Sequence, residues 1–452
     1  MAQRIRAREI TSVELISAHL EQIQRINRSI NAVVDLLADT ALQNARRADA
    51  KLASGEVCGR LHGVPISIKD SIDVQGTRCT AGTVGRRNAP QAEADATLVS
   101  RLRAAGAIPI AKTNLPDLLF SFESDNLLYG RTNNPYDLDR TPGGSSGGES
   151  ALIAACGSPL GLGSDAFGSV RVPAAFCGIA SIKPTSGRLP RLGHVPPAGG
   201  WLEAVWQMGP MTRWTEDLVL AMTLLAGEDG RDFTSPPVPL LEAQKLDGLR
   251  VAFFTYNGFA RCSREIEDAV RACAHFLASH GCRVEEQRPP GVEDAYELEL
   301  AIAGGDGCAA IDQYLEEIGS TQVHPLLVHF LDRMRPFRAS ASQLAERWAR
   351  WDSYRSAMAQ FFEQYAAIVC PVYTQAALKH GESAQTVNFE GFSYTMAWNL
   401  VGAPAATVRC GEANGLPINV QVVTKPWRDL LALEICGFIE AAFGGWKMSK
   451  LI

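Results

Sequence analysis

The sequence predicts an α/β fold in which strands and helices alternate along the chain and pack in layers. Two observations predict it. Short apolar segments with strand periodicity alternate with amphipathic segments of helical spacing, and 46% of the 452 residues are hydrophobic, enough for a large core. Charged residues make up 20% of the chain and Gly plus Pro 64 of 452 residues, which together with the apolar content excludes a disordered, collagen-like or coiled-coil chain. The sequence has no internal repeat and no low-complexity segment.

The N-terminal part supplies the first helices and strands. Thr11 to Glu14 has the form of a capping box, and the apolar residues after it follow at helical spacing, which predicts a helix to about Asn27. Val64, Ile66 and Ile68 alternate with other residues in a way typical of a strand, which ends at Lys69. The same reasoning predicts helices at 40–52 and 96–105 and a short buried strand at 107–110.

The rest of the chain continues the alternation. An apolar segment at 249–254, an amphipathic one at 263–280 and an apolar one at 282–286 predict a strand, a helix and a strand. Residues 236–240 are predicted to form a linker before them. The remaining predictions are a loop at 133–150, helices at 151–156 and 343–365, and a buried apolar run at 366–372.

Charge and cysteine content narrow the class of protein. Lys and Arg number 43 against 49 acidic residues, the reverse of the balance in a dedicated nucleic-acid-binding protein. Eleven cysteines without a CxxC pair predict free thiols and a reducing, cytoplasmic location. The sequence has no HExxH motif, so we expect no metal site, and no apolar run approaches the roughly 20 residues of a membrane span. We therefore expect a soluble protein that binds neither nucleic acid nor a membrane.

The segment 143–148, GGSSGG, is the most unusual in the chain, and four interpretations compete for it. A flexible linker is the simplest. A phosphate-binding loop needs a Lys in P-loop register, which is missing. A nucleophile elbow of the form G-x-S-x-G needs a strand directly before it, whereas 137–142 is a poor strand. The fourth interpretation joins this segment to sequence blocks on either side of it.

Two of these blocks carry the side chains on which the fourth interpretation depends, a lysine in one and serines in the other. A strand that ends in a lysine lies upstream at 63–70, and a second glycine-rich segment with serines lies downstream at 161–173. With them the chain resembles the amidase signature family, from about residue 9 to about residue 430. The blocks, which occur in the family's order, are GVPISIKD, AKTNLPD, NNPYDLDRTPGGSSGGESALIAA, GLGSDAFGSVRVPAAFCGIASIKPT, GPMTRWTEDL and GLPINVQVV.

The resemblance implies a catalytic triad. Ser169 would be the nucleophile, Ser145, preceded by a cis peptide bond, the bridging serine, and Lys69 the base. A serine hydroxyl is a weak nucleophile until a base takes its proton. Lysine is a base only when neutral, so its pKa has to fall well below about 10.4. Taken singly, such residues are more often solvated charges or loop hydroxyls, and the family pattern alone assigns them these roles.

The same resemblance implies an oxyanion hole in the loop that carries the nucleophile. Its backbone donors would be Ala166, Phe167, Gly168 and Ser169. The family usually has glycine where Phe167 stands, and phenylalanine restricts φ and brings a ring near the reacting centre. We expect the loop to accept this ring and the ring to shape the pocket. The expected supporting residues are Ser146, Asp165 and Arg171.

For the fold, the resemblance implies a mixed central β-sheet between layers of helices. One domain would span residues 1–452. Its expected parts are an N-terminal helical segment at 1–60, a catalytic core at 60–235, a variable α/β insertion at 236–340 and a C-terminal part of the core at 341–452.

For the function, the resemblance implies hydrolysis of a C–N bond through a serine acyl-enzyme, with no metal or cofactor. Phe120, Phe122 and Trp206 suggest an apolar or aromatic pocket, and hence a small amide or carbamate as substrate. The amidotransferase member of the family usually has Gln where this chain has Val172 and Asp where it has Trp206, which disfavours free glutamine. Two alternatives stay open, a non-catalytic binding protein and a component of an amidotransferase of the A type, and so does a homodimer.

Overall fold

A computed structural model of the chain describes residues 1–56, 58–196, 203, 205–242 and 245–450. Eleven strands in this part of the chain form one sheet. From edge to edge they are β1 (Val33–Leu36), β3 (Ile108–Thr113), β2 (Pro65–Lys69), β4 (Leu160–Asp165), β6 (Gln207–Thr212), β5 (Ala180–Lys183), β10 (Ala405–Ala413), β11 (Leu416–Thr424), β9 (Ala367–Pro371), β7 (Arg250–Phe253) and β8 (Arg283–Glu286).

The sheet is mixed, as expected. β2 pairs in parallel with β3 and β4, and β7 pairs in parallel with β8 and β9. The other neighbours are antiparallel. Because β2 and β4 are parallel neighbours, their C-terminal ends meet at one edge of the sheet, the usual place for ligand-binding loops in α/β folds. The last residues of these strands are Lys69 and Asp165.

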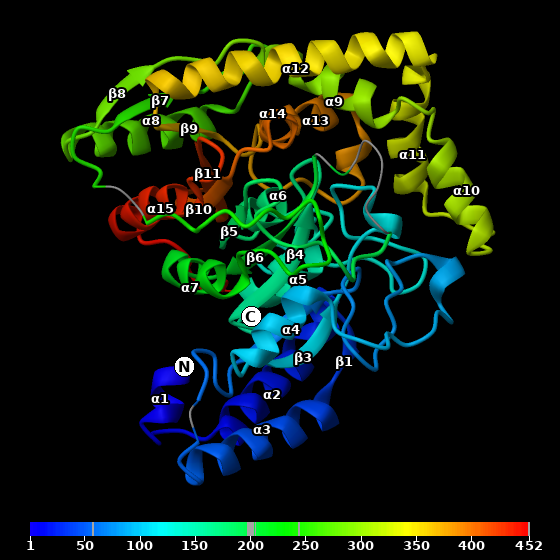
Figure 1. Cartoon of the computed structure of the whole chain (residues 1–452), viewed down its shortest axis with the longest axis vertical. Helices are drawn as coiled ribbons and strands as arrows, with labels where there is room; N and C mark the ends of the chain where they lie inside the picture. The colour runs from blue at the N-terminus through cyan, green and yellow to red at the C-terminus, as the bar shows by residue number, and fades with distance from the viewer. Residues whose placement is uncertain (57, 197–202, 204, 243–244, 451–452) are drawn as a thin grey trace.

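Helices accompany the sheet along the whole chain (Figure 1). Within the described residues they are α1 (Ala2–Arg6), α2 (Ser12–Ile30), α3 (Ala38–Ala53), α4 (Thr97–Ala104), α5 (Gly147–Ala154), α6 (Arg171–Phe176), α7 (Thr215–Leu225), α8 (Arg264–Ser279), α9 (Ala295–Ala303), α10 (Ala309–Glu317), α11 (Pro325–Met334), α12 (Ala341–Gln364), α13 (Thr386–Glu390), α14 (Ser393–Val401) and α15 (Asp429–Phe443).

These helices bury both faces of the sheet, because alternate residues of a strand face opposite sides. In β9, Val369 packs in a core that includes α4, α7, α8 and α15. The next residue toward the N-terminus, Ile368, packs in a second core with α9, α12 and α14. On the second side, α2, α3, α5 and α6 complete the layer. The predicted α/β fold with a sheet between helix layers is confirmed.

Local sequence determines several elements closely. In α2 the predicted capping box forms, since Thr11 Oγ1 accepts from the Glu14 N–H at 3.0 Å and the Glu14 carboxylate accepts from the Thr11 N–H at 2.8 Å. The helix is predicted to end near Asn27 but continues to Ile30. The next residue, Asn31, adopts a left-handed conformation that ends it. The structure also confirms, apart from small shifts at their ends, the helices predicted at 40–52, 96–105, 263–280 and 343–365 and the strands predicted at 64–69, 107–110, 249–254 and 282–286.

Both glycine-rich segments contain regular structure. The predicted loop at 133–150 ends earlier, because α5 begins at Gly147, and the GLGSD segment is the strand β4. A Cβ on Gly148 would lie 2.5 Å from backbone atoms of Asn114, and one on Gly161 would lie 1.8 Å from Glu149 Oε1. Glycine therefore permits close packing here. Composition alone does not distinguish this role from flexibility.

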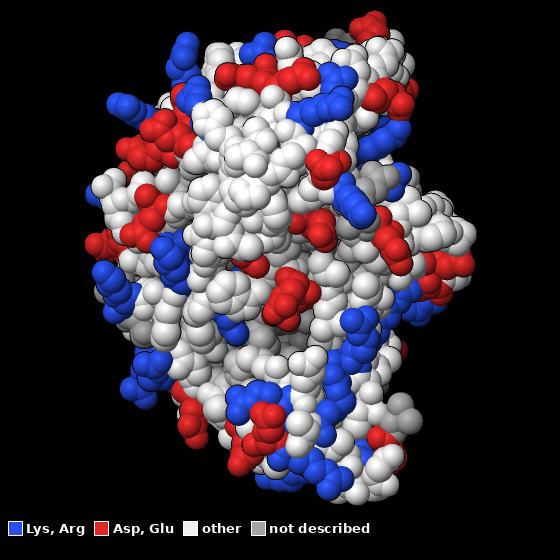
Figure 2. Space-filling model, turned by 90° about the vertical axis from the view of Figure 1, so that its left-hand side faces the viewer, with Lys and Arg blue, Asp and Glu red and all other residues white. Residues whose placement is uncertain are grey.

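The range 236–340 extends the central sheet. Its strands β7 and β8 lie at the sheet edge beside β9, and its helices α9 to α11 follow. In the described residues no helix has both the length and the apolar character needed to cross a membrane. Figure 2 shows one side of the surface, on which basic and acidic side chains are interspersed among uncharged ones.

Candidate active site

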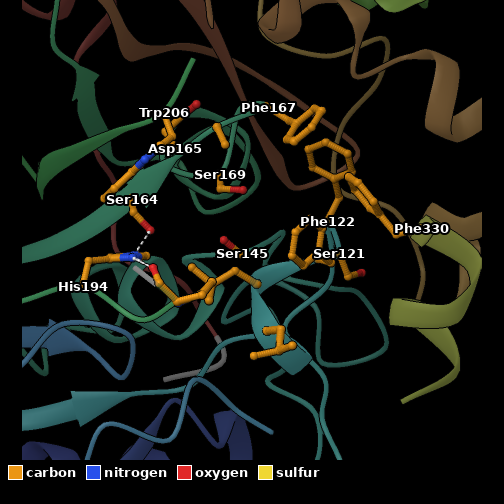
Figure 3. Close-up of a pocket in the computed structure, with 15 residues that line it drawn as sticks. Ser121, Phe122, Ser145, Ser164, Asp165, Phe167, Ser169, His194, Trp206 and Phe330 are labelled. Atoms are coloured by element: carbon orange, nitrogen blue, oxygen red, sulfur yellow. Dashed lines mark hydrogen bonds between the residues drawn. The ribbon is translucent and has the colours of Figure 1, made fainter. Parts of the chain in front are cut away.

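One cavity collects residues from the glycine-rich blocks and from distant parts of the chain (Figure 3). Ser145 and Ser169 lie between its two walls. One wall contains His194 and Trp206, whose ring centroids are 4.6 Å apart. The opposite wall is aromatic and consists of Phe120, Phe122, Phe167 and Phe330. The three predicted pocket residues, Phe120, Phe122 and Trp206, therefore all line this cavity.

Lys69 is the last residue of β2, and its side chain is completely buried. Its Nζ lies 2.7 Å from Ser145 Oγ, 2.9 Å from Ser146 Oγ and 3.2 Å from Ser164 Oγ. The structure therefore brings Lys69, Ser145 and Ser146 together. Ser145 is within direct proton-transfer distance of the lysine amine.

The electrostatics of this pocket favour an uncharged lysine. Burial lowers the pKa of Lys69 to about 7, against the opposing effect of the carboxylates of Asp165 and Glu149. Burial likewise raises the pKa of Glu149 to about 7, although Ser67 and Thr113 donate hydrogen bonds to it. Near neutral pH a large fraction of Lys69 is thus a free amine that can accept a proton.

A second buried lysine shows why Lys69 differs. Lys112 on β3 is as deeply buried, but its Nζ lies 3.2 Å from the Asp70 carboxylate. Burial acts to lower the pKa of Lys112, but the charge and hydrogen bond of Asp70, together with the nearby Cys79 and Asp73, outweigh this effect and raise that pKa above its usual value. Lys112 is therefore held as an ammonium ion in an ion pair, while Lys69 contacts hydroxyl groups instead.

The loop that carries Ser145 is held in place by close packing. Its Gly144–Ser145 peptide bond is cis, as the resemblance implied. A Cβ on Gly144 would lie 2.6 Å from the Ser121 carbonyl oxygen, and Ser124 Oγ accepts from the Gly147 N–H at 3.0 Å. This packing excludes the flexible-linker interpretation. The nucleophile-elbow interpretation is also excluded, since residues 137–142, all of them described, contain no strand.

Ser169 lies in the short connection from β4 to α6. Its side chain points into the cavity beside Ser145 (Figure 3). Its backbone carbonyl accepts from the Ser146 N–H at 3.1 Å, which ties the two serine loops together. Within the described part of the chain, the Ser169 hydroxyl makes no hydrogen bond, so it is available to a bound carbonyl group.

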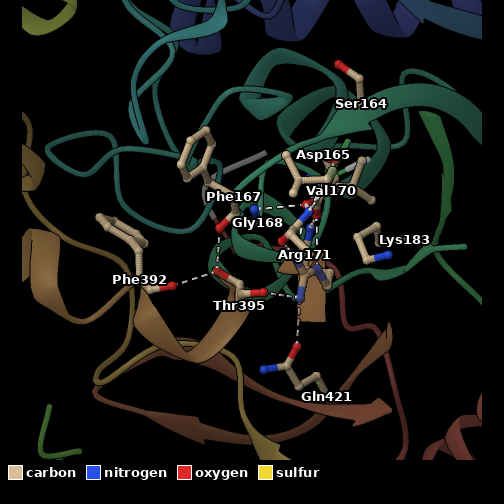
Figure 4. A network of polar contacts seen from close by, with 12 residues as sticks. Ser164, Asp165, Phe167, Gly168, Val170, Arg171, Lys183, Phe392, Thr395 and Gln421 are labelled. Atoms are coloured by element: carbon tan, nitrogen blue, oxygen red, sulfur yellow. Dashed lines mark hydrogen bonds and ion pairs between the residues drawn. The ribbon is translucent and has the colours of Figure 1, made fainter. Parts of the chain in front are cut away.

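A buried ion pair holds the Ser169 loop from behind (Figure 4). Arg171 Nη2 lies 3.0 Å from Asp165 Oδ1, and both side chains are fully buried. Burial acts to raise the pKa of Asp165, but Arg171 and Asn399 hold it at about 2. Arg171 also donates to the Thr395 carbonyl at 2.9 Å, so the loop is bound to α14.

The same ion pair changes the expected oxyanion hole. Asp165 Oδ1 accepts a hydrogen bond from the Gly168 N–H at 2.9 Å, so this N–H points back into the loop and not toward the cavity. Gly168 has φ of +129°, and a Cβ there would lie 2.3 Å from Thr395 Oγ1, which explains the glycine. The Gly168 N–H is therefore removed from the expected set of four donors, and the N–H groups of Ala166, Phe167 and Ser169 remain as candidates.

Phe167 fits its position without backbone strain. It is absent from the residues with positive φ, so the conformation does not require glycine. Its ring packs edge-to-face on Phe330, with centroids 5.4 Å apart, and its carbonyl accepts from Thr395 Oγ1 at 2.6 Å. The ring therefore forms part of the cavity wall.

Sequence reasoning assigns no role to several residues that line the cavity, among them Ser164, His194 and Phe330. His194 Nε2 lies 3.0 Å from Ser164 Oγ, and burial lowers the pKa of His194 to about 3. Phe330 comes from α11, which belongs to the range 236–340. A lone histidine and a phenylalanine at helical spacing carry no local signal, and only the block around Ser164 marks it as part of the site.

The described residues offer no candidate metal centre, because no three His, Cys, Asp or Glu side chains among them are grouped to hold an ion. The eleven cysteines are free.

This fold and this arrangement of Lys69, Ser145 and Ser169 define a class of serine amidohydrolases, and comparison with known proteins agrees. The family model described as Amidase matches residues 14–433. The chain belongs to the amidase signature family.

Similar proteins of known name fall into several groups within this family. The fatty-acid amide hydrolase 2-A of Danio rerio is 32% identical and covers 99% of this chain and 88% of its own. The indoleacetamide hydrolase of Bradyrhizobium diazoefficiens is 32% identical over 98% of this chain and 86% of its own. The A component of the glutamyl-tRNA(Gln) amidotransferase of Heliobacterium modesticaldum is 30% identical over 97% of this chain and 94% of its own.

Solved structures show the same range. A 6-aminohexanoate cyclic dimer hydrolase in complex with its substrate superposes with a TM-score of 0.88 at 25% identity, covering 100% of this chain and 98% of its own. A fatty acid amide hydrolase also superposes with a TM-score of 0.88, at 26% identity over 98% of this chain and 84% of its own. The relatives thus include hydrolases of several amides, and they do not point to one substrate.

Proposed function

We propose that this protein hydrolyses the C–N bond of small, apolar or aromatic amides or carbamates through an acyl-enzyme on Ser169. The observation that carries the proposal is the contact of Lys69 Nζ with Ser145 Oγ at 2.7 Å, next to a cavity into which Ser169 points. A buried lysine whose pKa is about 7 is a base at neutral pH, and its Nζ contacts hydroxyl groups rather than a carboxylate.

In the first half of the reaction, the neutral amine of Lys69 accepts the proton of Ser145 while Ser145 accepts the proton of Ser169. Ser169 Oγ then forms a bond to the substrate carbonyl carbon, and the carbonyl oxygen becomes an oxyanion. The N–H groups of Ala166, Phe167 and Ser169 stabilise this charge, each at a typical value of about 2.7–4 kcal/mol.

In the second half, the C–N bond breaks and the leaving nitrogen receives the proton that Lys69 and Ser145 hold. This leaves an ester of Ser169. A water molecule gives its proton to the same pair of groups and attacks the ester carbonyl, and Ser169 leaves with a proton returned through Ser145. The products are an acid and an amine, and the three residues return to their starting protonation states.

The cavity wall supports the substrate class. Phe120, Phe122, Phe167 and Phe330 face it from one side and Trp206 from the other. A carboxylate that could bind an α-ammonium group is lacking among the described lining residues, because the one acidic side chain there, Asp165, is paired with Arg171. This favours an uncharged, apolar or aryl substrate over free glutamine. A carbamate offers the same carbonyl to Ser169.

A second candidate function is that of an amidotransferase component of the A type, because the similarity to the Heliobacterium modesticaldum protein is as extensive as that to the hydrolases. That function requires ammonia release from glutamine together with partner proteins. We expect no release of ammonia from glutamine by the purified chain, and hydrolysis of simple anilides or arylacetamides instead.

A covalent probe tests the proposed function directly. The purified protein is treated with a fluorophosphonate, and the adduct is located by intact mass and peptide mapping. We expect a single adduct on Ser169 in the wild type, followed by turnover in a panel of amides, anilides and carbamates. An adduct on Ser145 would contradict the triad. A protein that binds an amide tightly but neither reacts with the probe nor turns over would instead be a non-catalytic binding protein.

A further inference from the structure

Three hydroxyl groups compete for the amine of Lys69, and only one arrangement of their protons makes it a base toward Ser145. A neutral amine has two N–H donors and one lone pair. The lone pair has to face the Ser145 hydroxyl if it is to receive that proton. The two N–H bonds then have to be donated to Ser146 and Ser164, so both of these serines have to act as acceptors toward Lys69.

Ser146 meets this requirement through the backbone. Its Oγ donates a hydrogen bond to the carbonyl oxygen of Ser164 at 3.3 Å. A carbonyl oxygen only accepts, so the hydroxyl proton of Ser146 is committed to it. The lone pairs of Ser146 Oγ are left to accept from Lys69 Nζ at 2.9 Å.

The hydroxyl proton of Ser164 is oriented by His194 instead of by a carbonyl. His194 Nδ1 lies 3.2 Å from the Pro196 carbonyl oxygen. Since the carbonyl only accepts, Nδ1 carries the ring proton and Nε2 is the acceptor. Ser164 Oγ, 3.0 Å from that Nε2, donates its proton to it and thereby accepts from Lys69. Burial keeps the imidazole neutral, because it lowers the pKa of His194 to about 3.

We propose that His194 is a positioning residue that directs the lone pair of Lys69 to Ser145, by holding the Ser164 hydroxyl as an acceptor. The inference rests on the proposed function in taking Lys69 as the base. Ser71 Oγ, 3.1 Å from the same Nε2, shares this acceptor but is not hydrogen-bonded to Lys69 Nζ. Ser71 therefore provides a matched control.

The test is a double-mutant cycle in which the rate of fluorophosphonate labelling at Ser169 is measured. In His194→Phe the ring still stacks on Trp206, but the Ser164 hydroxyl loses its acceptor and donates to the Lys69 lone pair, in competition with Ser145. We expect labelling to slow by about tenfold to a hundredfold, within the range of general-base catalysis. Removing that hydroxyl as well, in His194→Phe/Ser164→Ala, is expected to restore labelling to about the rate of Ser164→Ala alone.

Further variants separate this role from simple packing. His194→Gln places a carbonyl oxygen within reach of Ser164, so we expect it to be labelled faster than His194→Phe. Ser71→Ala is expected to stay within about twofold of wild type, because Ser71 is not hydrogen-bonded to Lys69 Nζ. Thermal unfolding of each variant shows that the fold is retained.

Two outcomes would overturn the inference. In the first, the effects of His194→Phe and Ser164→Ala on the labelling rate multiply in the double variant, so that it is slower than either single variant. His194 would then act only through packing. If His194→Phe is labelled at the wild-type rate, the Ser164 proton does not control Lys69. A wild-type protein that is not labelled at Ser169 at all would instead overturn the proposed function, and with it the basis of this inference.

Discussion

At the scale of single residues, the protonation of one amine controls the proposed reaction. Burial lowers the pKa of Lys69 to about 7. Only the neutral amine, which predominates above that pH, can act as a base. Below it the ammonium form predominates, so the rate falls by about tenfold per pH unit. We expect the rate of labelling or amide turnover to rise with pH through an apparent pKa near 7 and then to level off, as measured between about pH 5 and 9.

The assignment of that pKa needs a control, since burial also brings the pKa of Lys183 to about 7. Lys69→Met is expected to fold and to lose labelling and turnover at every pH, because the base toward Ser145 is gone. Lys183 donates to the Pro184 carbonyl at 2.9 Å and does not line the cavity, so Lys183→Met should keep the pH dependence of wild type. A profile that loses its step in Lys183→Met, and not in Lys69→Met, would contradict the assignment.

The neighbouring carboxylate of Glu149 offers an independent test of how nearby charge changes the pKa of Lys69. The charge of Glu149 raises the pKa of Lys69, against the larger effect of burial. Glu149→Gln removes that charge while an amide oxygen remains to accept from Thr113 or Ser67. We expect the step in the pH–rate profile to move to lower pH, because the ammonium form of Lys69 loses a stabilising partner. A step that stays at the pH of the wild type would show that Glu149 is uncharged when the enzyme works, and a step that moves to higher pH would contradict the stated effect of its charge.

At the scale of elements, α11 completes a cavity that the glycine-rich blocks begin. Its Phe330 packs edge-to-face on Phe120 at 5.5 Å and on Phe167 at 5.4 Å. Phe330→Ala should open this wall, so the ratio of kcat/KM for a bulky aryl amide to that for a small one is expected to rise at least about tenfold. The ratio is measured with matched anilides.

Phe389 on α13 provides the control for this prediction. It packs on Phe330 at 5.2 Å but does not line the cavity. Phe389→Ala should therefore lower the melting temperature, as the loss of a buried ring does, without a comparable change in the substrate ratio. Equal ratios in the two variants would mean that α11 does not select the substrate.

The elements also show where local sequence suffices. The strand that ends at Lys69 and the helix that Thr11 caps follow from patterns within a few residues, and both form, although the helix continues to Ile30. The strand β4 does not follow from a local pattern. It contains glycines, which allow Glu149 to pack closely against it, and a strand with glycines lacks the apolar alternation by which strands are predicted. His194 and Phe330 reach the cavity only through tertiary packing, and no pattern near either residue announces it.

At the scale of the whole molecule, one ionic network connects the Ser169 loop to the C-terminal part of the sheet. Arg171 contacts Asp165, the Thr395 carbonyl and Gln421 Oε1, which lies on β11 (Figure 4). The sequence indicates that Asp165 and Arg171 support the loop. It cannot indicate their partners, because these lie more than 200 positions away and meet them only when β10 and β11 pair beside β5.

The network should therefore determine the stability of the molecule as well as the shape of the site. Arg171→Met leaves the buried Asp165 carboxylate without its cation, and breaking such a pair typically costs about 3–5 kcal/mol in the free energy of unfolding. The control is Arg335→Met, which breaks an exposed pair with Asp312 and is expected to cost less than about 1 kcal/mol. Urea unfolding followed by circular dichroism compares the two.

Asp165→Asn should recover part of the loss in Arg171→Met, because no uncompensated charge then remains. A loss in Arg171→Met no larger than that in Arg335→Met would mean that the loop is held by packing and not by this ion pair.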